Sequence, residues 1–132
     1  KIKKKLQTAK MKLHIKHIKM MKTDKPVEFI DVWKLEDHIK AEARELGLYT
    51  VLRYFLLDSM AFENIRQQQH TVRPDFIEVL PGVMPRVIKR ICGSVKTPII
   101  AGGLITDKED VMAALSAGAI AVSSTNHQVW KM

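Results

Sequence analysis

From Gly47 onward, the chain alternates between short apolar runs and segments whose apolar residues recur at helical spacing. The first apolar run, 49–58, is rich in β-branched and aromatic residues, which favour strands, and a serine that can cap a helix follows it. The same alternation then recurs at a spacing of about 22 residues. This order predicts right-handed βαβ units and a parallel sheet that is covered on both faces.

Glycines and polar residues mark the ends of the predicted elements. Thr106 or Asp107 is expected to cap one helix, while Gly93 and Gly118 are expected to end the last two helices. A short turn, HQVWKM, closes the chain. We therefore expect strands at 49–58, 74–82, 97–105 and 119–126, and helices at 59–70, 83–93 and 108–118.

The first 40 residues follow this pattern less clearly. The alternation of Leu13 and Ile15 fits one strand, 26–35 fits either a helix or a strand, and 36–47 fits a helix that ends at a glycine. No shift in composition marks a domain boundary, and 132 residues suit one domain. We expect a single α/β domain, 1–132, with a divergent basic segment at its start.

Positive charge is concentrated at the amino end. Residues 1–25 hold ten lysines and one acid, whereas 26–132 have a net charge of −1. Such an asymmetry suggests an anionic partner, for example nucleic acid or a membrane surface. A solvated face of an amphipathic helix is the alternative, because apolar residues recur in this segment at steps of four, three and four.

Composition argues for a cytoplasmic protein without a membrane partner. No apolar run approaches the roughly 20 residues of a membrane span, and the basic start leads into no export signal. A single cysteine, Cys92, cannot form an internal disulfide, and its place on the apolar side of a helix is typical of a buried structural thiol. No histidine spacing resembles a metal site, so we expect neither a metal nor a cofactor.

Two polar loops follow the last two predicted strands. Gly102 and Gly103 end one strand, and Ser123 and Ser124 end the next. Ligands of parallel β/α proteins bind beyond the carboxyl ends of the strands. Glycine backbone lets amide N–H groups approach an anion, and hydroxyl groups can add further donors. The pair of loops predicts a phosphate site.

Two charged residues interrupt the apolar strands. Strand alternation points Arg53 and Glu78 toward one face of adjacent strands. A lone buried charge would cost several kcal/mol, so an ion pair between them is expected. The pair either fixes the strand register or lines the pocket and contacts the polar part of a phosphorylated ligand. Asp58 is expected to cap the helix that begins at Ser59.

Long stretches of the chain resemble the glycerol uptake operon antiterminator family, whose members look like phosphate-binding TIM barrels. The segments LRYFLLDSMAFENI, RPDFIEVLPGVMPRVIKRI and TPIIAGGLITDKEDVMAALSAGAIAVSSTNHQVW carry this resemblance, which runs from about Ala41 to Trp130. It implies a regulator, not an enzyme, that responds to glycerol 3-phosphate and acts on messenger RNA leaders to prevent premature termination. It implies that Gly102, Gly103, Ser123 and Ser124 hold the phosphate and that Arg53 and Glu78 line the pocket. The charge asymmetry, in contrast, is what predicts RNA contacts at Lys3, Lys4, Lys5, Lys10 and Lys12.

The chain is too short for the whole barrel that the resemblance implies. Eight strands and helices need roughly 200 residues or more. We therefore expect an incomplete, TIM-barrel-like parallel β/α barrel in which the four carboxyl-terminal βα units are clearest. Either the chain is the carboxyl-terminal part of a divergent or truncated family member, or the fold closes by self-association into a homo-oligomer, because exposed edges of a parallel sheet invite association.

An enzyme is the alternative function. A phosphate-binding β/α-barrel lyase, isomerase or glyceryl-phosphate transferase would act on a small phosphorylated substrate, with Glu78 or Asp58 as its base. No Lys or His is clearly placed beside the glycine and serine loops, which argues against this alternative.

Overall fold

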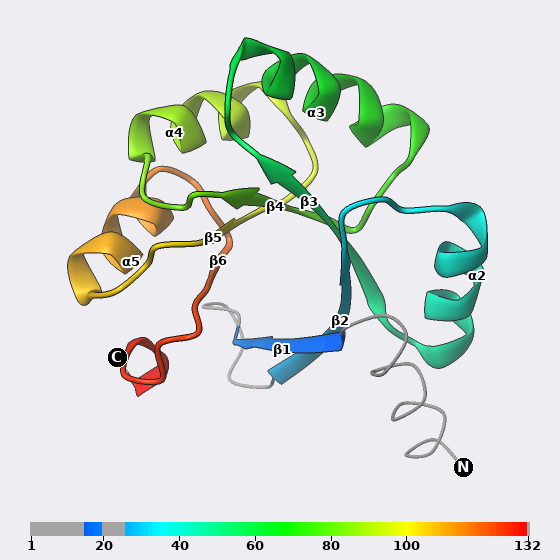
Figure 1. The fold of residues 1–132 in the computed structure, drawn as a ribbon, viewed down its shortest axis with the longest axis horizontal. Coiled ribbons are helices and arrows are strands. Elements are labelled where there is room, and N and C mark those ends of the chain that lie inside the picture. The colour runs from blue at the N-terminus through cyan, green and yellow to red at the C-terminus, as the bar shows by residue number, and fades with distance from the viewer. Residues whose placement is uncertain (1–14, 20–25, 132) are drawn as a thin grey trace.

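A six-stranded sheet forms the centre of the molecule, and helices cover its outer face (Figure 1). The structure is a computed structural model that describes residues 15–19 and 26–131. Strands β2 to β6 run parallel to one another, whereas β1 runs antiparallel to β2. The strands are β1 (Ile15–Lys19), β2 (Pro26–Val32), β3 (Tyr49–Phe55), β4 (Phe76–Leu80), β5 (Ile99–Gly102) and β6 (Ala121–Ser123).

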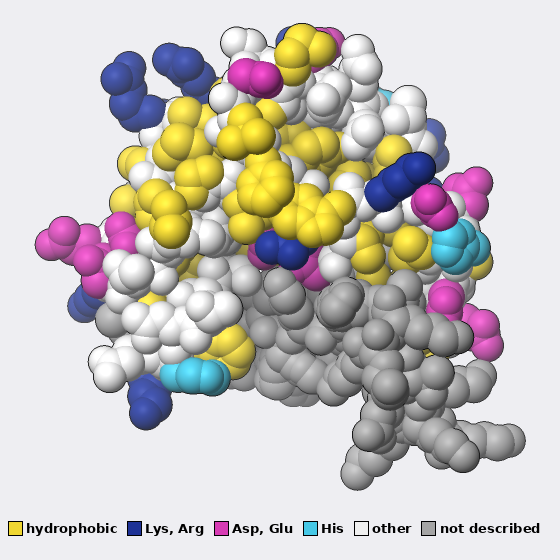
Figure 2. Space-filling view, in the orientation of Figure 1, with side chains coloured by type: hydrophobic (Ala, Val, Ile, Leu, Met, Phe, Trp, Pro, Cys, Tyr) yellow, Lys and Arg dark blue, Asp and Glu magenta, His cyan; other side chains and the backbone are white. Residues whose placement is uncertain are grey.

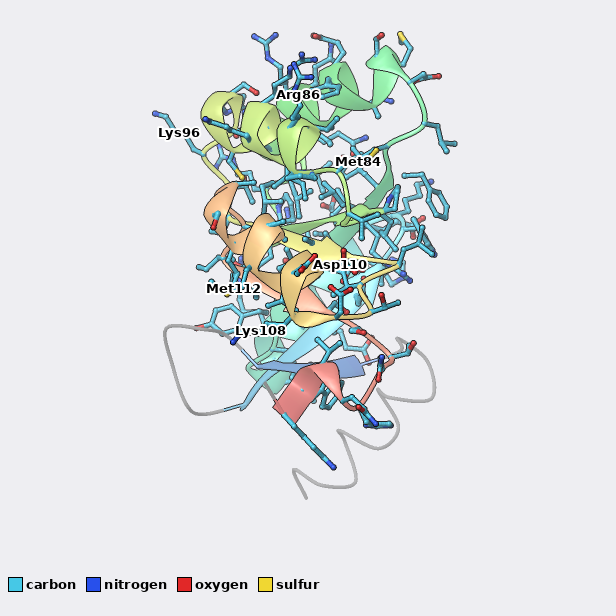
Figure 3. All side chains as sticks on the ribbon, turned by 90° about the vertical axis from the view of Figure 1, so that its left-hand side faces the viewer. Met84, Arg86, Lys96, Lys108, Asp110 and Met112 are labelled. Atoms are coloured by element: carbon cyan, nitrogen blue, oxygen red, sulfur yellow. The ribbon has the colours of Figure 1, made fainter. Side chains whose placement is uncertain are left out.

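One helix or turn follows each strand from β2 onward. The helices are α2 (Asp37–Leu46), α3 (Ser59–Thr71), α4 (Pro85–Ser94) and α5 (Lys108–Ser116), and the short 3₁₀ helix η1 (Val129–Lys131) follows β6. Since each helix returns the chain to the same end of the sheet, the carboxyl ends of all five parallel strands lie at one end. Figure 3 shows α4 running back along the sheet, with Met84 at the start of the helix and Lys96 just beyond its far end.

The strands curl into an incomplete barrel. Their spatial order equals their order in the sequence, so each strand pairs with the next one along the chain. β1 also approaches β6, and in Figure 1 it lies across the opening between β2 and β6. The predicted α/β class with a partial β/α barrel is thus confirmed, and the described strands number six.

Strand alternation divides the core into two layers. The helix-facing residues of β4, Ile77 and Val79, are fully buried in the larger cluster beneath α3, α4 and α5. Residues of the opposite face, including Val51 and Phe76, form a smaller cluster inside the curled sheet. Near the strand ends this inner face changes to the polar and charged residues that form the candidate site, among them Arg53 and Glu78.

The structure resolves one ambiguous stretch and corrects the end of one predicted helix. The ambiguous stretch 26–35 contains a strand, β2. Gly93 does not end its helix, since α4 continues to Ser94 and Val95 is the cap. Gly118 does follow α5, with a left-handed φ of 115°. Among the described residues, no helix is long and apolar enough to cross a membrane.

Candidate functional site

A buried charge cluster lies on the inner face of the sheet. Arg53 and Glu78 are register partners on β3 and β4, and Arg53 Nε donates a hydrogen bond of 3.0 Å to Glu78 Oε1. The same Nε lies 3.3 Å from Asp31 Oδ1 on β2. The two carboxylate side chains are 0% and 1% exposed, while that of Arg53 is 20% exposed. One arginine therefore offsets part of the desolvation cost of both acids and keeps an edge toward solvent.

Trp33 fixes the guanidinium from another direction. The Arg53 Cζ lies 4.3 Å from the centroid of the Trp33 ring, which is well within the range of a cation–π contact. Within the described part of the chain, the bond from Nε is the one hydrogen bond of this guanidinium. Its Nη1 and Nη2 groups therefore keep donors with which an anion could be bound in a two-point arrangement.

Gly102 makes room for the Glu78 side chain. A Cβ on Gly102 would lie 2.9 Å from Cδ and 3.0 Å from Oε2 of Glu78, closer than real Cβ atoms approach other atoms. The missing side chain therefore has a structural reason that is independent of any ligand. Gly103 has a different one, because its φ of 83° is in the left-handed region that side chains disfavour.

The backbone after β5 is held in an unusual shape. Leu104, like Gly103, has a positive φ, 62°, and its side chain is 71% exposed. The carbonyl of Gly103 accepts a hydrogen bond of 3.1 Å from the N–H of Gly82, which follows β4. The loops after β4 and β5 are thus tied together at the carboxyl end of the sheet.

The loop after β6 is fastened to the loop after β5. The Ser124 hydroxyl donates to the Ile105 carbonyl at 2.9 Å and accepts from the Asn126 N–H at 3.1 Å. Asn126 Nδ2 donates to the Thr106 carbonyl at 3.3 Å, and Trp130 Nε1 donates to the Ser124 carbonyl at 2.7 Å. The Ser124 hydroxyl therefore already has a structural task in this loop.

The predicted phosphate residues come from neighbouring strands. Gly102 and Ser123 are register partners at the ends of β5 and β6, so the two predicted loops do meet. Whether they bind phosphate stays a prediction. The predicted ion pair of Arg53 with Glu78 is present, and its pocket-lining role likewise stays a prediction. The five lysines predicted to contact RNA lie outside the described residues.

Asp58 and Asp107 act as helix caps. Asp58 Oδ1 accepts a hydrogen bond of 2.9 Å from the Met60 N–H, as expected for the start of α3. Asp107, one of the two expected caps, accepts from the N–H of Asp110 at 2.8 Å at the start of α5. Asp110, labelled in Figure 3, in turn accepts from the N–H of Thr106 at 3.0 Å. Glu78 is ion-paired with Arg53, and Asp58 caps α3, so each carboxylate has a structural role. The alternative role of either as an enzymatic base stays a prediction.

Two half-buried groups outside the cluster have raised pKa values. Desolvation raises the pKa of Tyr54 to about 12, and the phenol donates a hydrogen bond to Gln68 Oε1. Burial also raises the pKa of the Cys92 thiol, which packs against the main core as the sequence indicates. The described residues contain no group of three or more His, Cys, Asp and Glu side chains that could hold a metal ion.

Asp31 and Trp33 are the site residues that the sequence analysis missed. Both belong to the stretch whose helical or extended character the pattern left open, so the face on which they lie could not be assigned. The one available signal was an acid among the apolar residues of PVEFIDV, the same kind of interruption that revealed Arg53 and Glu78.

Comparison with known proteins identifies the family. The model of the glycerol-3-phosphate responsive antiterminators matches residues 7–130. The chain belongs to this family. The match begins well before Ala41, so family likeness extends into the basic segment, where the sequence follows the family less well.

Individual relatives of the chain agree with this assignment. Over 90 residues the chain is 43% identical to the uncharacterized protein YgcP of Escherichia coli K12, covering 68% of this chain and 47% of that protein. The glycerol uptake operon antiterminator regulatory protein of Listeria monocytogenes is 32% identical, with a TM-score of 0.64, over 74% of this chain and 52% of its own.

Two further solved structures share the fold. A glycerol uptake operon antiterminator-related protein of Thermotoga maritima is 33% identical, with a TM-score of 0.58, over 77% of this chain and 56% of its own. The YdjI aldolase of Escherichia coli, at 16% identity and a TM-score of 0.56 over 77% of this chain and 44% of its own, shows the fold alone. The chain spans about half the length of these relatives.

Proposed function

We propose that the chain is a regulator that binds messenger RNA leaders in response to glycerol 3-phosphate and prevents premature termination in genes of glycerol uptake and metabolism. The observation that carries this proposal is the family match, which spans nearly the whole chain. The chain spans about half the length of the two solved relatives. RNA binding in response to glycerol 3-phosphate is therefore a proposal for this chain. A role at nascent RNA places the protein in the cytoplasm and requires no enzymatic step.

The effector site is proposed at the carboxyl ends of β3 to β6. Gly102 and Gly103 would present backbone N–H groups to the phosphate, and Ser123 would add its hydroxyl. Ser124 would contribute mainly by holding the loop, because its hydroxyl already donates to the Ile105 carbonyl. Arg53 and Glu78 would contact the polar remainder of the ligand, since Arg53 is the cation of the cluster and its side chain is 20% exposed.

Regulation would arise from a shift between two states of these loops. The loops after β4, β5 and β6 are joined by hydrogen bonds, so a phosphate bound at one of them affects the others. The ligand favours RNA binding only by its difference in affinity for the two states. The two states could differ in conformation or in oligomeric state. Self-association of the chain stays a prediction.

Thermal unfolding with and without ligand tests the effector site. Glycerol 3-phosphate at about 100 times its dissociation constant should raise the free energy of unfolding by about 2.7 kcal/mol, while glycerol should leave it unchanged. Inorganic phosphate serves as the control for a site that recognises the phosphate alone. Equal effects of glycerol and glycerol 3-phosphate, or none from either, would refute the phosphate site.

A binding titration tests the second half of the proposal. A labelled leader RNA that contains a terminator should bind more tightly in the presence of glycerol 3-phosphate, whereas a scrambled RNA should not. Absence of RNA binding at low salt with ligand present would refute the regulatory function for this chain.

A further inference from the structure

A pair of stacked aromatic rings lies beside the charge cluster, and the proposed function does not use it. Trp33 directly follows β2, and Phe55 is the last residue of β3, so both lie at the carboxyl end of the sheet. Their ring centroids are 4.4 Å apart, with an angle of 27° between the ring planes. We call Trp33 and Phe55 the aromatic pair.

The aromatic pair is unusually exposed for such large apolar side chains. Trp33 is 49% and Phe55 is 52% exposed, which leaves a large part of their ring surface in contact with water. Leu57 and Met60, from the loop after β3 and the start of α3, and Leu104, from the loop after β5, are exposed as well. Figure 2 shows hydrophobic side chains gathered on the face drawn there. Large exposed apolar patches mark interaction or ligand-binding sites.

The chemistry of the aromatic pair fits a nucleobase. Unpaired RNA bases stack on aromatic side chains and on arginine planes, and any base has the flat face that this requires. The aromatic pair supplies flat rings, and the Arg53 guanidinium lies over one of them. The sequence of the chain also contains ten lysines in residues 1–25, and lysine side chains neutralise the phosphates of a nucleic acid.

We propose that the aromatic pair, Trp33 and Phe55, is a stacking surface for an unpaired base of the RNA. This inference rests on the proposed function and adds to it the place where single-stranded RNA is recognised. Because Trp33 also contacts Arg53, a ligand bound at Arg53 would alter the position of the same ring that supports the base. Effector and RNA would thus meet at neighbouring groups.

The test measures binding of a labelled single-stranded RNA of about 12 nucleotides. This length lies within the range of site sizes of known folds that bind single-stranded nucleic acids. A second oligonucleotide has the same backbone but abasic riboses in its centre. The full chain should bind the base-bearing RNA at least about fivefold more tightly than the abasic one, since stacking contributes that much or more per base. This comparison needs no variant and is therefore independent of changes in folding.

Substitutions then assign the effect to the aromatic pair. Trp33→Leu and Phe55→Leu should each weaken binding of the base-bearing RNA by roughly 5- to 100-fold, and Phe55→Leu, which leaves the contact between Trp33 and Arg53 in place, should leave binding of the abasic RNA unchanged. Tyr49→Leu is the matched control, because Tyr49 is 49% exposed but begins β3, at the opposite end of the strand from Phe55. It should bind both RNAs like the wild type.

The outcomes separate this inference from the proposed function. If the wild type binds base-bearing and abasic RNA equally, or if Phe55→Leu binds like the wild type, the stacking surface is refuted while RNA binding stands. If the wild type binds neither, both ideas fail. If Trp33→Leu and Phe55→Leu convert an oligomer into a monomer with no selective loss of base-bearing RNA, the aromatic pair is an interface between copies of the chain.

Discussion

Glu78 occupies the space that a side chain on Gly102 would need, and Arg53 holds it there. The Glu78 carboxyl carbon would lie 2.9 Å from a Cβ on Gly102, and its Oε1 accepts a hydrogen bond from Arg53 Nε. A glycine on β5 thus supports an ion pair between β3 and β4. The glycine pair of AGGLI has two separate causes: close packing at Gly102 and a left-handed backbone at Gly103.

Gly102→Ala is expected to destabilise the protein by about 1–3 kcal/mol, the usual cost of overpacking a core. The Glu78 side chain cannot move away cheaply, since it is buried and bound to Arg53. Denaturant unfolding measures the loss. Gly93→Ala is the control: nothing lies within 4 Å of a Cβ there, so this helical position should gain about 0.5–1 kcal/mol. A neutral Gly102→Ala would show that Glu78 has room to spare.

Gly103→Ala should reduce ligand binding in addition to stability. An alanine at a φ of 83° costs about 1–2 kcal/mol, and the strain changes the loop proposed to present its N–H groups to the phosphate. Gly47→Ala matches it, with a φ of 69° and open space around a Cβ, but it lies at the end of α2. Thermal unfolding with glycerol 3-phosphate should show a lost ligand effect for Gly103→Ala alone. Equal ligand effects in both variants would restrict Gly103 to its turn.

The strand and helix order could be predicted because each βα unit carries its own signals. Apolar runs, the Asp58 and Asp107 caps and the glycine after α5 are local features, and the structure contains them as expected. The Arg53–Glu78 pair was also predictable, since two charges on adjacent buried strands need each other. The prediction that Gly93 ends its helix was wrong, because a glycine can also lie inside the last turn of a helix, and α4 continues to Ser94.

The rest of the site depended on contacts that sequence periodicity cannot supply. Asp31 joins Arg53 only because β2 pairs with β3 in one particular register, Asp31 beside Val51. The same register brings Trp33 to Phe55 and to Arg53. In the sequence these residues lie 20 or 22 positions from their partners, in a stretch that fitted a helix equally well. The two glycines were predicted to lie beside a phosphate, whereas the structure shows that Gly102 makes room for the carboxylate of Glu78.

The Arg53–Glu78 pair should behave as one unit in a double-mutant cycle. Arg53→Met leaves two buried carboxylates without their shared cation, so we expect a loss of about 3–5 kcal/mol. Glu78→Gln keeps the shape and should cost less, because Asp31 still faces the arginine. The double variant should lose clearly less than the sum of the two, as measured by denaturant unfolding. Strictly additive losses would contradict a direct interaction.

Alkaline pH should destabilise the protein through Tyr54. Desolvation raises its pKa in the folded state to about 12, from an ordinary value of 10.0 that applies to the unfolded chain. Between these values the unfolded state loses its proton first, so stability falls as the pH rises from about 10 to 12. Tyr54→Phe should remove this part of the fall at the cost of the bond to Gln68. Unchanged pH dependence in Tyr54→Phe would assign the loss to other groups.

The basic segment should supply RNA affinity that depends on salt but not on base sequence. Contacts of lysine with phosphate give a log–log slope of about −0.7 to −0.9 per phosphate, and they position a protein without reading bases. Replacing Lys3, Lys4, Lys5, Lys10 and Lys12 by glutamine should therefore flatten the slope by several units for leader and scrambled RNA alike, and leave stabilisation by glycerol 3-phosphate intact. The matched control removes the same charge from exposed positions of the described chain, Lys89, Arg90, Lys96, Lys108 and Lys131. If both sets of substitutions change the salt slope equally, the effect comes from net charge, and the segment is a solvated face instead of an RNA contact.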